Sequence, residues 1–339
     1  MQPIIVGLDL AKSVFQVHGV DAEGQVVVRR KLRRREVIPF FEKLDPCLIG
    51  MEACATAHFW TRELSKLGHD VRMMPPSYVK AYLRRQKNDA ADAEAICEAV
   101  QRPNMRFVPL KSAERQSVLT LHKARELLVR QRTMLINAIR GHCAEFGLIA
   151  PLGARKVDEL IEDVRSADEA IVPDIARTAL LALADQLALL ADEIGRMDRR
   201  LLAWHRQDEL SQRLATIPGV GVIGATALSA SIPNPTMFRS GREFAAFLGL
   251  VPRQNSSGGK DRLGRISKMG DGYLRKLLVV GATSVVRRAK TDALAAAPWV
   301  RSLLERRPAR VATVAMANKT ARIAWAVMAR GEVYRPIAA

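Results

Sequence analysis

The sequence has few cysteines and no long run of uncharged apolar residues. None of its four cysteines forms a C-x-x-C pair, so neither a structural zinc site nor a disulfide framework is expected. The most apolar stretch, residues 178–195, is interrupted by Asp185 and Asp192, which excludes a membrane span. The opening residues MQPIIVGLDL contain no basic leader, so we expect no signal peptide and a cytoplasmic protein with reduced thiols.

Acidic residues are scarce relative to basic ones. The 339-residue chain has 35 Asp and Glu against 53 Lys and Arg, a formal net charge of +18. Because 48% of the residues are hydrophobic, the chain is long and apolar enough for two or three folded domains. The excess of positive charge favours a polyanionic partner, most simply nucleic acid. A basic protein that is merely soluble or ribosome-associated is the alternative.

Short β-branched runs alternate with helical stretches in the first hundred residues. Three apolar runs come first, and the turn-forming DAEG between the last two predicts a hairpin. Strands and helices then alternate, which predicts a mixed α/β sheet. The expected strands cover residues 3–10, 13–21, 24–32, 47–53 and 69–74. The expected helices cover residues 35–44, 58–68 and 77–102, the last broken near Lys87.

The middle of the chain has a different, purely helical pattern. Apolar residues there are spaced alternately three and four apart, which is the seam of a coiled coil. They are Leu180, Leu183, Leu187, Leu190, Ile194, Met197 and Leu201. A weaker seam precedes them: Val118, Leu121, Leu128, Leu135 and Ile139. We predict two long helices that form an antiparallel coiled-coil hairpin or a dimer arm, with an ordinary helical bundle as the alternative.

The stretch KNDAADAEAI gathers acidic residues within a basic chain. Asp89 and Asp92 are three apart, so on a helix they share one face, although Asp89 could equally cap the helix. Asp9 and Glu52 each end an expected strand, and such side chains can converge at one edge of a sheet. Four clustered carboxylates need cations, and oxygen ligands select Mg²⁺ or Mn²⁺. This set predicts a metal site for phosphoryl transfer.

A second informative stretch is VPRQNSSGGKDRLGRISKMGDG. Ser/Gly-rich segments are usually flexible linkers, and that interpretation stays open. Basic residues run through this one, however, and a serine nucleophile needs such a surrounding to hold a phosphate. The candidate phosphate contacts are Arg253, Lys260, Arg262, Arg265 and Lys268.

The segment IPGVG, residues 217–221, resembles a helix-hairpin-helix turn. Such a turn directs backbone N–H groups at a DNA phosphate without reading the sequence. Gly219 and Gly221 are therefore candidate DNA contacts, and a plain connection between helices is the alternative. The chain is expected to be helical on both sides of this turn and, beyond the serine-containing loop, over residues 273–290 and 309–331.

Three segments resemble one transposase family. GLDLAKSVFQVHGVD, GMEACATAHFWTRELSKLGHDVRMMPP and KNDAADAEAI are similar to the insertion-sequence one-hundred-and-ten family, which includes the Piv-type DNA invertases. The resemblance implies an N-terminal RNase H-like, RuvC-like domain with a D-E-D-D acid set. By motif match the set is Asp9, Glu52, Asp89 and Asp92, holding Mg²⁺ or Mn²⁺. It also implies a RuvC-like domain at 1–105, a helical coiled-coil region at 106–208 and a C-terminal transposase domain at 209–339.

The resemblance extends to the serine-containing loop. In SSGGKDRLGRISKMG the serine directly before glycine is Ser257, which the resemblance makes the nucleophile of a phosphoserine intermediate; Ser256 is the fallback, and Ser267 is taken as structural. The implied activity is that of an RNA-guided recombinase of a bacterial insertion sequence. Its partners would be donor and target DNA, an element-encoded guide RNA and further copies of itself, in a dimer or tetramer at the nucleoid.

Two other functions remain open from the residues alone. One is a metal-dependent junction nuclease that cuts DNA without serine chemistry, and it predicts that Ser257→Ala retains activity. The other is a nucleic-acid-binding protein without catalysis, and it predicts that the four acids do not converge.

Overall fold

The chain divides into two compact units, Met1–Ser112 and Ala113–Ala339, each described below by itself. The structure is a computed structural model that describes residues 2–83, 89–153, 155–291 and 298–335, with the backbone but not the side chain of Asp89. The predicted three-part division at residues 105 and 208 stays a prediction.

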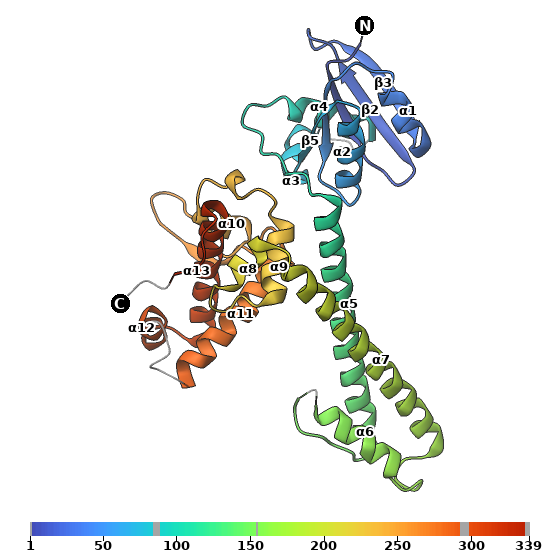
Figure 1. Ribbon diagram of the computed structural model, residues 1–339, viewed down its shortest axis with the longest axis vertical. Coiled ribbons are helices and arrows are strands. Elements are labelled where there is room, and N and C mark those ends of the chain that lie inside the picture. The colour runs from blue at the N-terminus through green and yellow to red at the C-terminus, as the bar shows by residue number, and fades with distance from the viewer. Residues whose placement is uncertain (1, 84–88, 154, 292–297, 336–339) are drawn as a thin grey trace. The chain divides into compact units, whose positions relative to one another are not determined.

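The first unit is built on a five-stranded mixed sheet, which confirms the predicted α/β class (Figure 1). The strand order is β3-β2-β1-β4-β5; β1, β2 and β3 are antiparallel, whereas β4 and β5 run parallel to β1. The strands are β1 (Ile5–Asp9), β2 (Val14–Val20), β3 (Val26–Arg33), β4 (Leu48–Glu52) and β5 (Asp70–Met74). All five lie within the expected runs or extend them by at most two residues.

Helices cover both faces of this sheet. They are α1 (Val37–Phe41), α2 (Ala57–Lys66), α3 (Pro76–Val79) and α4 (Asp89–Val100), with 3₁₀ turns η1 (Arg34–Glu36) and η2 (Lys80–Tyr82). Val6 and Leu8 of β1 are fully buried in one core cluster with Trp60 of α2. Because side chains alternate along a strand, Gly7 faces the other way, where α4 packs on the sheet.

Two long helices begin the second unit. α5 (Ala113–Ala144) and α7 (Asp174–His205) lie side by side, and the short α6 (Lys156–Ser166) packs near one end (Figure 1). Every seventh residue of the predicted α7 seam is buried: Leu180, Leu187, Ile194 and Leu201. The intervening Leu183, Leu190 and Met197 are only half-buried. The pairing of two long helices is thus present, while a dimer arm stays a prediction. No described helix is long and apolar enough to cross a membrane.

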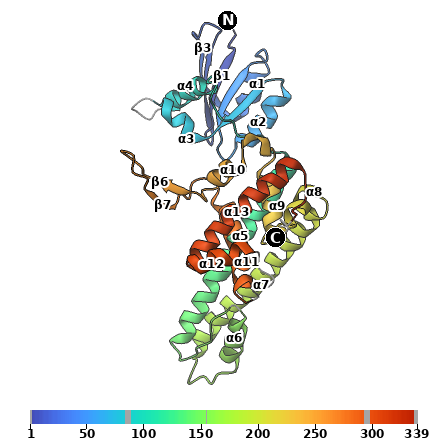
Figure 2. The same ribbon diagram turned by 90° about the vertical axis from the view of Figure 1, so that its left-hand side faces the viewer.

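The rest of the second unit is a helical core that carries one β-hairpin. Its elements are α8 (Glu209–Ala215), α9 (Val222–Ser231), η3 (Pro235–Met237), α10 (Gly241–Phe247), β6 (Pro252–Gln254), β7 (Leu263–Ile266), α11 (Gly272–Thr291), α12 (Pro298–Arg306) and α13 (Ala309–Arg330). The predicted serine-containing loop therefore contains two strands, which the sequence pattern did not indicate. Their antiparallel pairing forms the hairpin that projects from the helical core (Figure 2).

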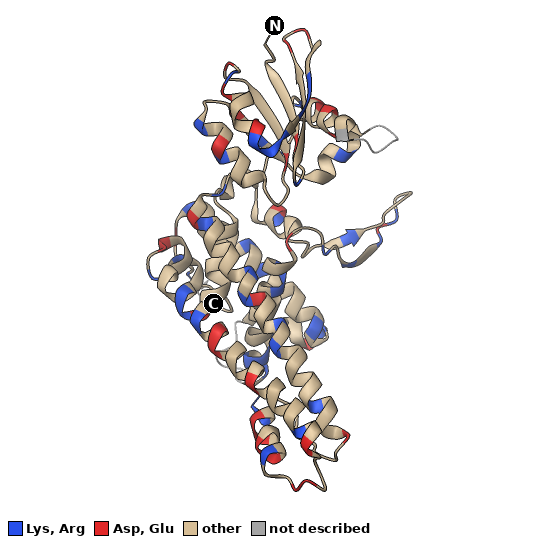
Figure 3. Ribbon diagram, turned by 90° about the vertical axis from the view of Figure 1, so that its right-hand side faces the viewer, with Lys and Arg blue, Asp and Glu red and all other residues tan. Residues whose placement is uncertain are grey.

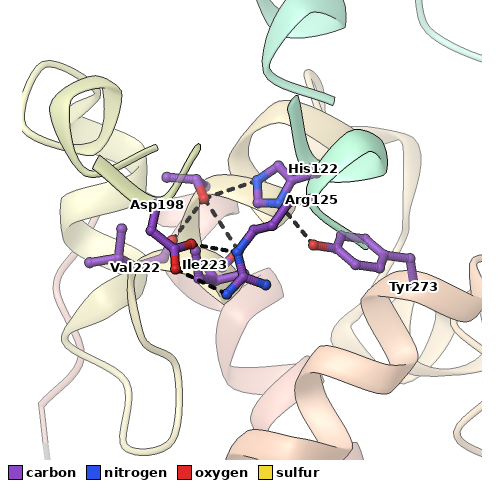
Figure 4. A network of polar contacts seen from close by, with 7 residues as sticks. His122, Arg125, Asp198, Val222, Ile223 and Tyr273 are labelled. Atoms are coloured by element: carbon purple, nitrogen blue, oxygen red, sulfur yellow. Dashed lines mark hydrogen bonds and ion pairs between the residues drawn. The ribbon is translucent and has the colours of Figure 1, made fainter. Parts of the chain in front are cut away.

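A buried polar network joins four of these helices (Figure 4). The Thr226 hydroxyl donates to the Val222 carbonyl at 2.8 Å, so towards the Nε2 of His122, 3.0 Å away, it can only accept. His122 therefore carries its proton on Nε2, and its Nδ1 accepts from the Tyr273 hydroxyl at 2.9 Å. Beside them the Arg125 guanidinium pairs with Asp198 across α5 and α7. The network fixes the long helices to α9 and α11.

Candidate active site

The pairing of β1 with β4 brings two of the predicted acids together. Gly7 is the registered partner of Gly50, so two residues further on Asp9 and Glu52 end neighbouring parallel strands at the same level. Both also point to the same face, because side chains repeat every second residue. A Cβ on Gly7 would lie 2.5 Å from the Cys97 nitrogen, and one on Gly50 would lie 2.7 Å from the Val100 Cβ. That face is therefore the one covered by α4.

Helix α4 supplies the third described acid. Burial first, and then the negative charges of Asp9 and Asp92, raise the pKa of Glu52 above its usual value. Glu52 is therefore near enough to both Asp9 and Asp92 for their charges to act on it. The fourth predicted ligand, Asp89, is the first residue of α4, and its side chain lies outside the described part of the chain.

The chemistry of this acid set fits a divalent cation. All donors are carboxylate oxygens, which suit hard metals, and the mutual repulsion that raises the pKa of Glu52 is what a bound cation would relieve. Among the side chains that the structure describes, no group of three or more His, Cys, Asp or Glu is arranged to hold a metal ion. Asp9, Glu52 and Asp92 alone thus do not make a closed ligand cage.

Ser257 lies at the tip of the β6–β7 hairpin. It begins a four-residue turn in which the Lys260 nitrogen donates to the Ser257 carbonyl at 3.1 Å. The two central residues, Gly258 and Gly259, have φ of 57° and 75°. A turn with positive φ at both central positions strongly favours glycine and matches the twist of a hairpin. The glycines that suggested a linker thus build a defined turn.

The two adjacent serines have different surroundings. The Ser256 hydroxyl donates to Asp261 and accepts from the Arg262 nitrogen and from Gln254, each at 3.1 Å. Ser256 thus bridges the two sides of the hairpin. The Ser257 hydroxyl is exposed and makes no hydrogen bond to any described residue. It is therefore accessible to a substrate, whereas Ser256 and Ser267, whose hydroxyl accepts from the Met269 nitrogen at 3.4 Å, serve local structure.

The base of the hairpin borders a groove of about 1560 Å³ between α10, α12 and α13. Its basic residues are Arg242, Arg265, Lys268, Arg310, Lys319 and Arg322, and no acidic residue is among the described residues that line it. Two of the predicted phosphate contacts, Arg265 and Lys268, thus lie on this groove. The other three, Arg253, Lys260 and Arg262, are exposed on the hairpin, whose ribbon carries Lys and Arg in Figure 3.

The groove also contains residues that the sequence pattern did not single out. The Lys319 ammonium lies 4.2 Å from the centre of the Trp299 ring. Burial, and then the charge of Arg322, lower the pKa of Lys319. Such a partly desolvated ammonium gains from an anionic ligand. Lys319 and Arg322 are three apart on one helix, but the same spacing occurs in many solvated helices, so spacing alone could not identify them.

The IPGVG segment connects α8 and α9, as the predicted motif requires. Gly219 has a φ of 85°, and a Cβ there would lie 2.8 Å from the Gly281 carbonyl oxygen of α11. This close approach explains Gly219 by packing. Gly221 is exposed at the start of α9. DNA contact by this turn stays a prediction.

Comparisons with known proteins identify the family of this chain. A DEDD-type transposase model, described as Transposase, matches residues 6–146, and one described as Transposase IS116/IS110/IS902 family matches residues 211–297. The chain is 52% identical to a probable family 20 transposase of Pseudomonas aeruginosa, over 98% of both chains. It is 38% identical to the transposase for insertion sequence element IS1328 of Yersinia enterocolitica, over 97% of this chain and 98% of the other.

These matches define the class of protein as a transposase, an enzyme that cleaves and recombines DNA. Similarity to the transposase for insertion sequence element IS1111A of Coxiella burnetii is 39% identity over 98% of this chain and 91% of that one. The chain belongs to the IS110 family of insertion-sequence transposases, which confirms the resemblance found in its motifs.

Proposed function

We propose that this transposase is an RNA-guided DNA recombinase that uses Ser257 as nucleophile and a divalent cation held by Asp9, Glu52, Asp89 and Asp92. The single observation that carries the proposal is the register of Gly7 with Gly50, because it directs Asp9 and Glu52 to one face at one level. A nucleic-acid-binding protein without catalysis would not need these two acids to lie together. A Mg²⁺ or Mn²⁺ ion there would stabilise negative charge on a phosphate during cleavage.

The serine step uses residues of the second unit. The Ser257 oxygen attacks a DNA phosphorus, a serine–phosphate bond forms and the bond from that phosphorus to one deoxyribose oxygen breaks. The serine loses its proton, and the leaving deoxyribose oxygen gains one. Support comes from the exposed Ser257 hydroxyl and from the exposed Arg253, Lys260 and Arg262 of the same hairpin, since arginine and lysine bind phosphate oxygens. The rejoining step reverses this exchange with another DNA end.

The RNA guide and the oligomer belong to the same proposal. Support for the guide is the family membership together with the net charge of +18, which suits two kinds of nucleic acid. Support for self-association is the apolar α7 seam, where Leu183, Leu190 and Met197 remain half-buried. Strand exchange between two duplexes needs more than one active site, which a dimer or tetramer provides.

A covalent-trapping assay tests the chemistry. The full-length protein is mixed with the flanking RNA of its element, Mg²⁺ and end-labelled junction DNA, and the products are separated on a denaturing gel. We expect a slow-migrating protein–DNA adduct with the wild type and with Ser256→Ala. Ser257→Ala and Asp9→Asn should give none, because one lacks the nucleophile and the other a metal ligand.

The variants separate the alternatives. Cleaved DNA without an adduct, unchanged in Ser257→Ala, would overturn serine chemistry in favour of a metal-dependent junction nuclease. An adduct lost only in Ser256→Ala would show that Ser256, and not Ser257, is the nucleophile. Full activity without the RNA would contradict RNA guidance.

A further inference from the structure

The edge strand β3 carries a row of basic residues on the face of the acids. Side chains alternate along a strand, so Arg29, Lys31 and Arg33 share one face and Arg30 and Leu32 the other. Leu32 is buried in the core with Val6 and Trp60, the cluster that packs opposite α4. Arg29, Lys31 and Arg33, here called the β3 row, therefore lie on the α4 side.

The strand register places the β3 row at the level of the acids. Across the sheet, Asp9 pairs with Gln16, and Gln16 pairs with Lys31. Lys31 is thus two strands away from Asp9, which is about 10 Å between backbones. On the same face, Arg33 lies two residues to one side of Lys31 along β3 and pairs with Val14. Arg29 lies two residues to the other side and pairs with His18. The row and the acids therefore lie on the same face of one sheet, with β2 between them.

Two neighbouring basic residues, Arg30 and Arg34, have aromatic partners instead. The Arg34 guanidinium lies 5.1 Å from the Trp60 ring centre, and Arg30 lies 5.7 Å from that of Phe40. The three side chains of the row are exposed, and within the described ranges no ion pair joins any of them to an acid. Figure 3 shows Lys and Arg along this edge of the sheet.

Two observations favour a ligand over simple protection of the sheet edge. One inward or central cation is enough to block edge-to-edge pairing, whereas here three like charges repeat at about 6.8 Å along one line. Glu94 of α4 lines the shallow cleft of about 370 Å³ beside Arg29 and Lys31, and it is the one acid among the described residues there. The row is therefore a linear positive track, and its middle residue, Lys31, lies at the level of the acid site.

We propose that the β3 row binds the phosphodiester backbone of DNA next to the phosphate at the acid site. This inference rests on the proposed function for what happens at the acids, but not for binding itself. Three nucleotides of a strand rise by about 10 Å, so Lys31 would hold a phosphate within about three nucleotides of the one being cut. The row contacts backbone only, and it positions DNA without reading its sequence.

The test compares two triple variants of the full-length protein that lose the same charge. One is Arg29→Gln, Lys31→Gln and Arg33→Gln; the matched control changes the exposed Arg35, Lys43 and Lys80 of the same unit to Gln. Affinity for a duplex DNA oligonucleotide is measured by fluorescence anisotropy over a series of KCl concentrations. We expect the row variant to bind at least about tenfold more weakly at low salt, with a salt slope lower by roughly 2 to 3. The control should keep most of its slope.

Equal losses in the two variants would overturn the inference, since net charge alone would explain them. A loss seen with duplex RNA but not with DNA would overturn the assignment to DNA. As single variants, Lys31→Gln should bind DNA more weakly than the wild type, whereas Lys31→Arg, which keeps the charge, should bind like the wild type. DNA binding and adduct formation are measured separately. Failure of the adduct assay would therefore leave this inference standing, and normal DNA binding by the row variant would leave the serine chemistry standing.

Discussion

His122 of α5 and Tyr273 of α11 are joined by a buried hydrogen bond of 2.9 Å, although 151 positions separate them in the chain. Tyr273 lies seven residues after the end of the hairpin that carries Ser257, and its backbone nitrogen donates to the Asp271 carboxylate at 2.8 Å at the start of α11. The bond therefore fixes the segment that leaves the hairpin to the long helix α5. A polar pair in a core is costly unless both groups are satisfied, and here both are.

The stability of the second unit should fall in mild acid because of His122. Burial first, then the charges of Arg125 and Lys123, lower its pKa from 6.5 to about 4. Between these values the unfolded chain binds more protons at this residue than the folded one, so the free energy of unfolding falls as the pH falls. The loss is roughly 3 kcal/mol by pH 4. Urea unfolding followed by circular dichroism from neutral pH to pH 4 measures it.

The control for that titration is His122→Gln, which cannot take up the proton. Other groups titrate equally in both proteins, so the difference in free energy of unfolding between wild type and variant should shrink as the pH falls. A difference that stays constant over this range would contradict a neutral, buried His122.

Gly7→Ala should destabilise the first unit. Its Cβ would collide with the backbone of α4, 2.5 Å from the Cys97 nitrogen, and backbone cannot move aside cheaply. The free energy of unfolding should fall by about 3 kcal/mol, which urea unfolding measures as a lower midpoint. Gly141→Ala is the matched control: it is exposed in α5 with nothing near its Cβ, and it should stabilise by up to about 1 kcal/mol. Wild-type stability in Gly7→Ala would mean that α4 does not pack on β1.

Lys268→Gly should raise stability while weakening DNA binding. Lys268 has a φ of 55°, the only positive φ among the described non-glycine residues, and this conformation costs a side chain about 1 kcal/mol. Lys268 lines the wall of the basic groove. Backbone strain of this kind often occurs at functional sites. We expect a higher melting temperature and a salt slope of DNA binding lower by about 1. Lys268→Asn should lower the salt slope of DNA binding by the same amount, with a smaller gain in stability. If both variants bind DNA like the wild type, Lys268 is not part of the binding surface.

One cysteine of the four should react rapidly with a thiol reagent. Cys47, Cys97 and Cys143 are buried, and burial raises the pKa of Cys47 and Cys97 to about 11, whereas Cys54 is exposed. Ellman's reagent should therefore titrate one thiol per native chain and four after denaturation. Cys54 is two residues after Glu52, so a bulky adduct there should also reduce cleavage. Cys54→Ser should abolish the fast phase; a fast phase that persists would show that a buried cysteine is accessible.

Local patterns predicted the elements well where one face of an element is apolar. The five strands of the sheet and the long helices α5 and α7 were predicted because alternation and heptad spacing record which face is buried. The β6–β7 hairpin was missed, because its strands are short and exposed and carry no alternation. The α12–α13 groove was missed for a related reason: Trp299 and Lys319 meet only when two helices pack, and neither helix records its partner.

The sequence by itself determined the family, the α/β class and the four acids as candidates, since these depend on short segments and on composition. Only the tertiary structure decided which side chains share a face. The pairing of Gly7 with Gly50 sets Asp9 beside Glu52, and the pairing of Gln16 with Lys31 brings the β3 row to their level. Strand register arises from hydrogen bonds between distant segments and from helix packing across the sheet. Neither can be inferred from a single stretch of residues.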